Sequence, residues 1–440
     1  MQKMKDSGVE WIGEIPEHWD IKRLKYAIPD RCVGAWGEEE KGGGDGYICL
    51  RVADFDYPKM KFADKDISEL TRRSYKPSTI RRLKLKKNDL IIEKSGGGEK
   101  TPVGRSVLFT YDYPAVYSNF LEKLSLNEFI KPKWMLYVLN TFYNLRYIKN
   151  FINQTTGIQN LDLNKLLNQM AIPVPILEEQ QIIIDFLDFK CSKIDSLVDK
   201  IQSEIDVLQQ YRKSVIYEAV TKGLNPNVEM KDSEENWLGS IPAHWEITRV
   251  ASLYSERNES GNPDLPVLMV SINSGVSDSE VSNEDRMRSV VQSEDKTKYK
   301  RVFPDDLVYN MMRAWQGAFG AVRVDGLVSP AYVVAKPKQQ LDSRYIEALF
   351  RTPAAISEMK RFSYGIADFR LRLYWQYFRN IRLCLPPLEE QKRIADFVEE
   401  RSNKINAVIV KKQEQLSVLA DYKKSLIYEY VTGKKEVPAS

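Results

Sequence analysis

Residues 177–221 read LEEQQIIIDFLDFKCSKIDSLVDKIQSEIDVLQQYRKSVIYEAVT, and residues 388–432 read LEEQKRIADFVEERSNKINAVIVKKQEQLSVLADYKKSLIYEYVT. The two stretches align without a gap, and in each of them apolar residues return at alternating steps of about three and four, which is typical of a coiled-coil seam. A helix of about 40–45 residues is roughly 60–65 Å long, and with so narrow an apolar stripe it needs a partner. We therefore predict that the two helices pair with each other. The seam residues predicted to make the coiled coil and to support partner docking are Ile194, Val198, Ile201, Ile205 and Leu208 in the first copy, and Ile405, Ile409, Leu416, Leu419 and Leu426 in the second.

Lys412 interrupts the second seam at the position that Ile201 occupies in the first. A lysine in a seam either fixes the register of the helices or extends its ammonium group to water, and we expect the second. Prolines precede both helices, and a Gly-then-Pro exit, KGLNP at 222–226, ends the first.

A shorter motif is also repeated half a chain apart. Residues 11–19 read WIGEIPEHW, residues 237–245 read WLGSIPAHW, and Lys-Asp-Ser precedes each. The chain is therefore a duplication whose frame is copied while the middles, about 20–174 and 246–385, have diverged. The first motif has no helix before it, whereas the second follows one. We therefore expect a circular arrangement in which the C-terminal helix ends beside residues 5–19 and the two chain ends lie close together.

The divergent middles have mixed α/β patterns. DLIIEK (89–94) and AVRVDGLVSPAYVVAKPK (321–338) look like strands, and residues 131–151 and 342–362 look like amphipathic helices at matching places. The predicted fold class is α+β: two globular α/β domains separated by two long helices that pair as a coiled coil, with an internal pseudo-two-fold repeat. The predicted boundaries are 1–174, 175–224, 225–385 and 386–440.

The bulk properties fit a multidomain globular chain of 440 residues with 43% hydrophobic residues and a net charge of +4. The four cysteines have no metal-site spacing and fit reduced thiols, and no apolar run is long enough to cross a bilayer. We expect a cytoplasmic protein, whose mildly basic charge suits an anionic partner.

Catalytic machinery is hard to find, and no catalytic or metal-binding residue is predicted. The only histidines, His18 and His244, occupy equivalent places in the repeated motif, where a turn or cap role is expected. Three short matches are interpreted as chance. SGGGEKT (95–101) has Glu99 where a phosphate loop requires glycine, SPAY (329–332) is an incomplete methyltransferase tetrad, and Pro29-Asp30 with Glu39-Glu40-Lys41 imitates a nuclease motif outside any strand pattern.

Basic residues gather between 71 and 105, beside the glycines 96–98. Such a run is usually a solvated surface, but bare glycine backbone also lets N–H groups approach phosphate oxygens. NQTTGIQNLDLNKL (153–166) is a polar loop before the first long helix. The residues of the first half predicted to bind DNA are Arg72, Arg73, Lys94, Gly96, Gly97, Gly98, Lys100, Arg105, Gln159 and Asn160.

In the second half, YNMMRAWQGAFGAVR (309–323) places amide and guanidinium side chains that can pair with adenine and guanine in the major groove. Trp315 and Met311 are expected to be core residues of this segment. SYGIADFRLRLYWQYFRN (363–380) is at the place that corresponds to the polar loop of the first half, so polar loops at equivalent positions are expected to face DNA. The predicted DNA-binding residues here are Asn310, Arg313, Gln316, Arg323, Tyr364, Arg370 and Arg372.

Together, the repeated WIGEIPEHW motif, KSGGGEKTPVGR (94–105), YNMMRAWQGAFG (309–320), LVSPAY (327–332) and the two proline-then-LEEQ helix starts resemble the DNA-specificity subunit of type I restriction–modification systems. The resemblance covers essentially the whole chain. It implies that each globular domain is a target-recognition domain for one half of a split DNA site. It also implies that the two long helices form an antiparallel coiled coil, which sets the spacing of the domains and docks two methyltransferase subunits.

The resemblance also implies that restriction subunits join through the methyltransferase, and that AdoMet, ATP and magnesium are bound by those partners while this chain binds no cofactor and has no activity. Two other classes stay open from the residues: an enzyme, such as a fused methyltransferase or nuclease, and a coiled-coil scaffold that does not bind DNA. Activity of the purified chain would favour the first, and absence of salt-sensitive, sequence-selective DNA binding would favour the second.

Overall fold

The computed structural model describes residues 3–40, 46–154, 157–260, 262–272, 274–279, 298–365 and 371–438. It divides into two compact units, one of Met1–Gln202 with Gln413–Ser440 and one of Ser203–Lys412. Each unit contains one globular head and one part of each long helix. We call residues 3–174 the first head and residues 227–385 the second head.

The long helices are α5 (Leu177–Lys222) and α10 (Leu388–Val431). Both begin after prolines, which cannot continue a preceding hydrogen-bonded segment. They end near glycines in the left-handed conformation, Gly223 with φ of 74° and Gly433 with φ of 69°, as helix C-termini commonly do.

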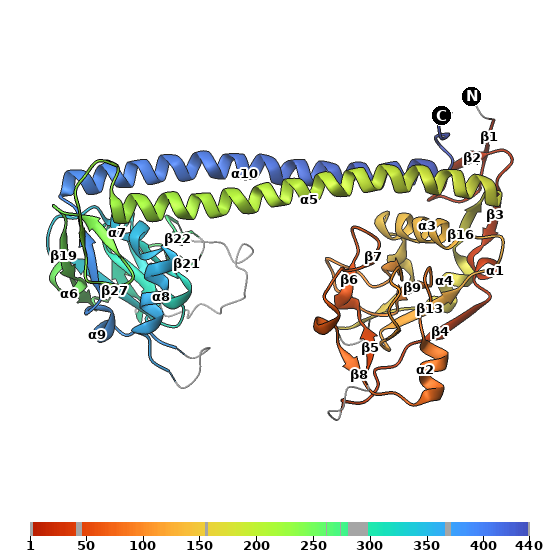
Figure 1. Ribbon diagram of the computed structural model, residues 1–440, viewed down its shortest axis with the longest axis horizontal. Helices are drawn as coiled ribbons and strands as arrows, with labels where there is room; N and C mark the ends of the chain where they lie inside the picture. Colours follow the sequence, from red (N-terminus) through yellow and green to blue (C-terminus); the bar gives the residue numbers. More distant parts are fainter. Residues whose placement is uncertain are drawn as a thin grey trace. The chain divides into compact units, whose positions relative to one another are not determined.

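Within each unit the two helices run antiparallel and side by side (Figure 1). In the first unit the rings of Phe186 and Tyr430 lie 4.6 Å apart, and Lys423 Nζ lies 2.5 Å from Asp195 Oδ1. In the second unit Arg212 donates to Asn406. Of the predicted seam residues, six are buried and four are half-buried; the buried ones are Ile194, Ile201, Ile205, Ile405, Ile409 and Leu426, and the half-buried ones are Val198, Leu208, Leu416 and Leu419.

The expectation for Lys412 was wrong. Its ammonium does not extend to water, because Nζ donates to Glu204 Oε2 across the helix pair at 2.5 Å and the side chain is 22% exposed. Lys412 therefore connects α10 to α5 through an ion pair with Glu204.

Each of the two repeated motifs contacts the first turn of a long helix. His18 Nε2 lies 3.0 Å from Glu179 Oε2, and Trp19 Nε1 donates to Glu179 Oε1 at 2.9 Å, so the first motif is held by the first turn of α5. His244 Nε2 lies 2.8 Å from Glu390 Oε2 in the first turn of α10. Both histidines lie in the turn of their motif, as expected, and each also contacts the first turn of a long helix.

The glutamine that ends each LEEQ is buried and has the same role in both units. Gln180 Oε1 accepts from the amide of Lys131 at 2.9 Å, and Gln391 Oε1 accepts from the amide of Asp342 at 3.0 Å. A buried amide side chain must have its hydrogen bonds satisfied, and here each one fixes the start of a long helix against its own head.

The C-terminal end of α10 meets the first repeated motif within the first unit, as the circular arrangement predicts. Lys434 Nζ donates to the carbonyl of Ile12 at 2.9 Å. A Cβ atom on Gly433 would lie 2.2 Å from Pro16 Cδ and 3.2 Å from Trp19. The expectation that the C-terminal helix ends beside residues 5–19 is confirmed.

Replacing Gly433 by alanine is expected to weaken this junction, because the new methyl group overlaps Pro16 and the residue must keep a left-handed φ. Gly8→Ala is the matched control, since Gly8 has φ of 67° but nothing within 4 Å of the added Cβ. The control is expected to lose only the left-handed penalty, about 1–2 kcal/mol, and Gly433→Ala more. Urea unfolding measures both, and equal losses would show that the chain end does not pack on the motif.

The first head is built on a six-stranded sheet in the order β4-β13-β9-β11-β7-β6. Its strands are β4 (Asp30–Val33), β6 (Phe55–Asp56), β7 (Lys61–Phe62), β9 (Leu90–Glu93), β11 (Ser106–Leu108) and β13 (Leu121–Ser125). Two smaller sheets have two strands each: β1 (Met4–Asp6) pairs with β2 (Glu14–Pro16), and β3 (Asp20–Arg23) pairs with β16 (Ala171–Val174). Two others have three strands each. One has the order β12 (Ala115–Tyr117), β5 (Tyr47–Leu50), β8 (Arg72–Arg73), and the other has the order β10 (Ser95–Gly96), β15 (Gln159–Leu161), β14 (Ile152–Gln154).

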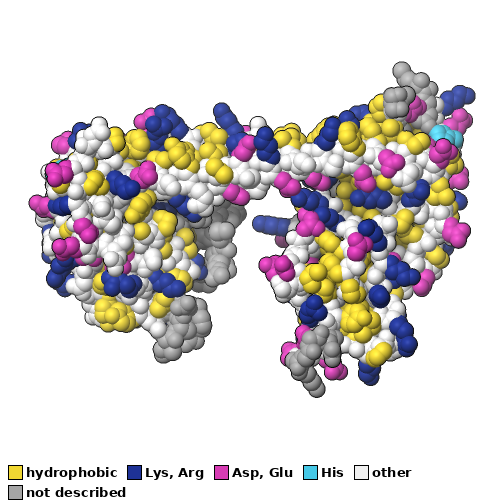
Figure 2. All heavy atoms as spheres, in the orientation of Figure 1, with side chains coloured by type: hydrophobic (Ala, Val, Ile, Leu, Met, Phe, Trp, Pro, Cys, Tyr) yellow, Lys and Arg dark blue, Asp and Glu magenta, His cyan; other side chains and the backbone are white. Residues whose placement is uncertain are grey.

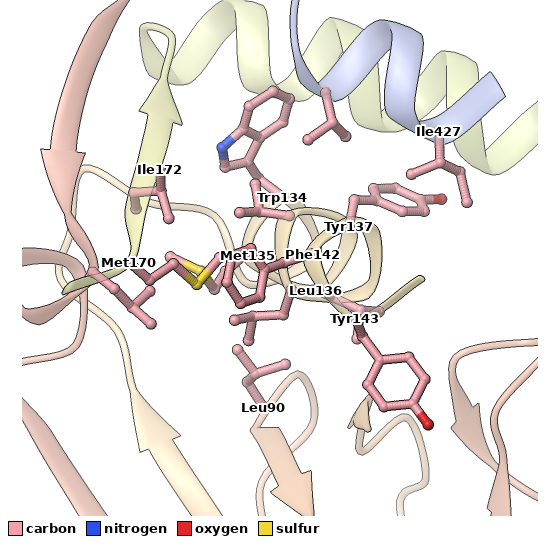
Figure 3. Close-up of a cluster of buried hydrophobic side chains, with 14 of the residues drawn as sticks. Leu90, Trp134, Met135, Leu136, Tyr137, Phe142, Tyr143, Met170, Ile172 and Ile427 are labelled. Atoms are coloured by element: carbon pink, nitrogen blue, oxygen red, sulfur yellow. The ribbon is translucent and has the colours of Figure 1, made fainter. Parts of the chain in front are cut away.

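The helices of the first head are α1 (Leu24–Ala27), α2 (Pro77–Leu83), α3 (Pro132–Asn144) and α4 (Leu163–Gln169), with 3-10 turns at Val52–Asp54, Ile67–Glu69 and Tyr147–Phe151. The buried helix α3 lies between the sheet and the long helices. Figure 3 shows Trp134 and Tyr137 pointing from α3 toward the long helices, where Ile427 lies, and Leu136 pointing toward Leu90 of the sheet. One hydrophobic core therefore joins the sheet, α3 and the helix pair.

The second head has a four-stranded sheet in the order β20-β27-β24-β25. The strands are β20 (Tyr254–Arg257), β24 (Leu307–Asn310), β25 (Phe319–Ala321) and β27 (Tyr332–Pro337), and the helices are α6 (Val250–Leu253), α7 (Ser343–Phe350), α8 (Pro353–Arg361) and α9 (Trp375–Phe378), with a 3-10 turn at Ala314–Gln316. The remaining pairs are β17 (Met230–Asp232) with β18 (Ser240–Pro242), β19 (Glu246–Arg249) with β28 (Arg382–Leu385), β21 (Val270–Ser271) with β22 (Gly275–Val276), and β23 (Lys300–Val302) with β26 (Gly326–Val328).

The two heads share a fold even where their sequences have diverged. The strand order β4-β13-β9-β11 corresponds to β20-β27-β24-β25, with the same antiparallel pairings. Leu90 pairs with Leu108 and Leu124, as Leu307 pairs with Ala321 and Ala335. The turns before these strands also match, because Asn88 and Asp305 both have positive φ, 71° and 70°. The loop from β9 to β11 therefore corresponds to the loop from β24 to β25.

Candidate nucleic-acid interface

One edge of the first head's sheet collects the loops that the sequence singled out. β13 is antiparallel to both β4 and β9, and β11 is antiparallel to β9. The ends of β4 and β9 therefore lie beside the starts of β13 and β11. Gly34 donates its amide to Leu121 O at 3.0 Å, and Lys94 donates its amide to Phe120 O at 2.8 Å. Residues 34–36, 94–105 and 118–120 thus meet at this edge.

The glycine-rich loop, residues 94–105, contacts the polar hairpin formed by β14 and β15. β10 pairs with β15, and Leu161 donates its amide to Lys94 O at 2.8 Å. Gly97 has φ of 65°, and a Cβ there would lie 2.5 Å from the amide nitrogen of Val103. Glycine is required at this position, because both the left-handed φ and the close backbone approach exclude a side chain.

Neighbouring residues of β15 have opposite roles, as alternation along a strand requires. Gln159 is buried, and its Oε1 accepts from the amide of Val103 at 3.1 Å, so it fixes the glycine-rich loop. Asn160 is exposed and accepts from Ser95 Oγ at 2.7 Å. The structure therefore offers Asn160 to a ligand and removes Gln159 from the predicted DNA-binding set, because its side chain is not at the surface.

Arg105 is paired with a carboxylate inside the head. Its Nε and Nη2 donate to the two carboxylate oxygens of Glu93 at 2.8 and 3.1 Å, and the Glu93 side chain is fully buried while that of Arg105 is 20% exposed. These hydrogen bonds to Glu93 raise the pKa of the Arg105 guanidinium. A bidentate pair of this kind occupies the guanidinium fork, so Arg105 supports the base of the loop from inside.

The basic run from 71 to 105 is not one patch. Lys86 and Lys87 precede β9, whereas Lys94 follows it, so they lie at opposite ends of a four-residue strand. A strand rises about 3.3 Å per residue, which places the two groups at opposite edges of the sheet. Lys100 is exposed near the glycines, and Gly96 and Gly98 are half-buried.

Arg72 and Arg73 lie in β8, outside the glycine-rich loop. Arg72 Nη1 donates to Gly46 O at 2.8 Å, and the guanidinium of Arg73 lies 4.3 Å from the ring centre of Trp36. Trp36 is 39% exposed and belongs to the segment 34–36 at the loop edge. Arg73 is half-buried by this cation–π contact, which orients Trp36.

The second head has the same edge. Asn310 ends β24 and Phe319 begins β25, so the loop 311–318 occupies the place of the glycine-rich loop. Asn310 Oδ1 accepts from the amide of Met312 at 3.0 Å, which shapes the turn, whereas Arg313 and Gln316 are exposed. Met311 packs half-buried against the core as expected, and Trp315, also half-buried, donates Nε1 to Met312 O at 2.9 Å.

A second polar segment lies beside this loop, as in the first head. Leu373 donates its amide to Met311 O at 2.9 Å, which matches the contact of Leu161 with Lys94. Tyr364 and Arg372 exchange backbone hydrogen bonds and both are exposed, and the Tyr364 ring stacks on Tyr377 at 4.1 Å. Arg370 lies outside the described residues.

Arg323 is separated from the loop. It follows the far end of β25, where Ala321 pairs with Leu307, so the whole strand lies between Arg323 and Arg313. It is exposed, but it belongs to the opposite edge of the sheet.

The sequence reasoning missed Phe120. This residue is 40% exposed at the loop edge, and its carbonyl accepts from the amides of Lys94 and Ser95. Ser118 and Ser329 hold equivalent turns, in which Leu121 and Tyr332 donate to them at 3.0 and 2.9 Å. SPAY is thus the second head's version of the Phe120 turn. No local signal marks Phe120, because its exposure follows only from the strand order.

This edge offers amide, guanidinium and backbone N–H donors with exposed aromatic rings, a set suited to base edges and phosphates. Among the described residues, no group of three or more His, Cys, Asp or Glu side chains is arranged to hold a metal ion. No described helix is long and apolar enough to span a membrane.

Comparison with known proteins gives one consistent family. A family model described as "Type I restriction modification DNA specificity domain" matches residues 73–206 and 246–417. The MjaVIII type I restriction enzyme specificity subunit of Methanocaldococcus jannaschii is 26% identical, with 96% of this chain and 94% of that protein covered. The StySPI specificity subunit of Salmonella potsdam is 23% identical over 88% of this chain and 83% of its own length.

A solved structure shares the fold. It is described as concerning complex assembly and conformational transition of the type I R-M system, and it matches with a TM-score of 0.58 and 14% identity, covering 95% of this chain and 98% of that one.

Proposed function

Because the chain belongs to the type I restriction–modification DNA specificity family, we propose that it is the sequence-specific DNA-binding subunit of such a complex and that each head recognises one part of a bipartite target. The expected target is asymmetric, since the glycine-rich loop of the first head and the loop 311–318 of the second head have different sequences.

One observation carries the proposal. The glycine-rich loop and the loop 311–318 have unrelated sequences, yet they occupy the same strand connection in two equivalent sheets. Each also bonds to a polar segment through the same backbone contact, Leu161 to Lys94 and Leu373 to Met311. A duplicated surface with different side chains is what two readers of different sequences require.

The long helices are proposed to set the spacing of the heads and to dock two methyltransferase subunits, with restriction subunits joining through them. Half-sites about one helical turn apart, near 34 Å, suit such a mount. Both helices keep large apolar side chains at the surface (Figure 2), which favours protein partners. In the first unit these are Ile182, Phe189, Leu197, Val418 and Tyr422, and in the second unit Val207, Tyr211, Val408 and Val410.

Catalysis is proposed to belong to the partners. The chain is then a non-catalytic subunit, and AdoMet, ATP and magnesium are bound by the methyltransferase and restriction subunits. The DNA-specificity family supports this proposal, and the hydrogen-bond donors and aromatic rings of the interface suit binding.

The decisive experiment maps methylated bases in cells with and without the gene, each together with its methyltransferase partner. A split, asymmetric motif that appears only with the gene is the expected result. An unchanged methylation pattern, together with DNA binding by the assembled complex that does not depend on sequence, would contradict the proposal. Methylation or cleavage by the purified chain alone would instead favour a fused enzyme.

Arg313→Ala tests one predicted base contact. If the exposed guanidinium pairs with guanine, the variant loses about 1–3 kcal/mol of binding free energy on the cognate sequence and little on other sequences. Binding of the assembled complex to cognate and scrambled DNA measures this difference. An equal loss on both would assign Arg313 to a phosphate.

A further inference from the structure

Ser95 connects two exposed side chains at the loop edge of the first head. Its Oγ donates to Asn160 Oδ1 at 2.7 Å, and its amide lies 3.3 Å from the carbonyl oxygen of Phe120. Ser95 and Asn160 are direct cross-strand partners in β10 and β15. One residue, Ser95, therefore contacts both the side-chain amide of Asn160 and the backbone of Phe120.

The amide of Asn160 is oriented and still able to bind. The Ser95 hydroxyl occupies one lone pair of Oδ1, which leaves a second lone pair and both hydrogens of Nδ2. Adenine offers N6–H as a donor and N7 as an acceptor in the major groove, and an asparagine amide matches both. Holding the side chain in advance lowers the entropy lost on binding.

The side chain of Asn160 is exposed on β15, the middle strand of the small sheet β10-β15-β14. Asn153 of β14 is its other cross-strand partner and is exposed as well, whereas the next residue, Gln159, is buried against the head. The outer face of the β10-β15-β14 sheet is thus polar. The hairpin β14–β15 of this sheet is a two-stranded ribbon, and such a ribbon fits the major groove, which is about 12 Å wide.

Phe120 provides an exposed apolar ring, which the polar amide of Asn160 does not. Its ring is 40% exposed although its backbone is fixed by Lys94 and Ser95, so the exposure is built into the turn. The partner of adenine is thymine, whose 5-methyl group projects into the same groove and is recognised by apolar contact, including with phenylalanine.

Resting on the proposed function, we propose that Asn160 and Phe120 together recognise one A·T pair in the half-site of the first head. Asn160 binds N6 and N7 of the adenine, and the Phe120 ring contacts the thymine methyl. Ser95 is the positioning residue, because it binds the side-chain amide of Asn160 and the backbone carbonyl of Phe120. The equivalent of Phe120 in the second head is in the SPAY turn, where Ala331 precedes Tyr332.

The test uses the assembled methyltransferase complex and duplexes that carry its mapped target. Each A·T pair is altered in turn, with deoxyuridine for thymine, which removes only the methyl group, or 7-deazaadenine for adenine, which removes the N7 acceptor. At one pair, each change is expected to weaken binding by about tenfold, which is 1.4 kcal/mol.

Two variants assign the groups. Phe120→Ala is expected to lose the response to deoxyuridine at that pair and keep the response to 7-deazaadenine, and Asn160→Ala is expected to show the reverse. Tyr26→Ala removes another exposed aromatic ring, 59% exposed in α1, and should keep both responses. Melting temperatures of the free chain check that all three variants fold.

The outcomes separate this inference from the function on which it rests. Sequence-specific binding with no A·T pair that couples to both variants overturns the inference and leaves the function standing. Loss of binding on every sequence in Phe120→Ala, with no response to deoxyuridine in the parent protein, also overturns it and assigns the ring to a wedge between bases. Absence of any sequence preference in the parent complex contradicts the function itself.

Discussion

Replacing Ile205 by aspartate is expected to destabilise the second unit by about 3–5 kcal/mol. Ile205 is 2% exposed between α5 and α10, next to the Glu204–Lys412 ion pair. The carboxylate would be buried without a partner of its own, since Lys412 already pairs with Glu204. Urea unfolding followed by helix content measures the loss, and co-purification with the methyltransferase measures its effect on assembly.

Val207→Asp is the matched control. Val207 lies two residues further along the same helix and is 64% exposed, so its carboxylate stays in water and stability should be unchanged. If Ile205→Asp unfolds like the control and still co-purifies normally, the helices do not pair through this seam. If only Val207→Asp loses the partner, the exposed apolar side chains of α5 form the docking surface.

Replacing Arg105 by alanine is expected to cost about 3–5 kcal/mol in the first unit, because it leaves the carboxylate of Glu93 buried and unpaired. The Glu93 side chain is fully buried and accepts both hydrogen bonds from Arg105. The glycine-rich loop begins one residue after Glu93 and ends at Arg105, so the loss of the pair is expected to loosen the loop. DNA affinity should fall as a consequence.

Two comparisons isolate the cause. Lys100→Ala removes an exposed cation of the same loop and should leave stability unchanged while weakening DNA binding in a salt-dependent way. The double variant Glu93→Leu with Arg105→Met removes both charges, and it should recover most of the lost stability. A stable Arg105→Ala protein with weak DNA binding would show that Arg105 contacts DNA directly.

The frame of the protein follows from periodicity. The seam of α5 and α10 is readable because a helix face repeats about every 3.6 residues, and a gapless copy of the same face reveals its partner. Lys412 shows where periodicity is insufficient. Its pairing with Glu204 depends on the register of the two helices, which the spacing along one helix does not contain.

The sequence indicated the segments of the candidate interface better than the roles of its single residues. Loops with glycine, amide and guanidinium groups stand out in the sequence, and the structure joins them in pairs in each head. The roles of single residues follow from strand alternation and pairing. Gln159 and Asn160 are neighbours in sequence, yet Gln159 is buried and Asn160 is exposed. Arg105 and Lys100 are cations of the same loop, but Arg105 is paired with the buried Glu93 whereas Lys100 is exposed.

The sequence by itself determined that the chain is a duplication and that two long helices pair. These properties are written in local repeats and residue types. Only the tertiary structure decided that the two diverged middles share a sheet, that the glycine-rich loop and the loop 311–318 are equivalent, and that Phe120 and Asn160 both contact Ser95. The physical reason is that a sheet edge is assembled by hydrogen bonds between distant strands, and the side chains exposed there are fixed by that pairing.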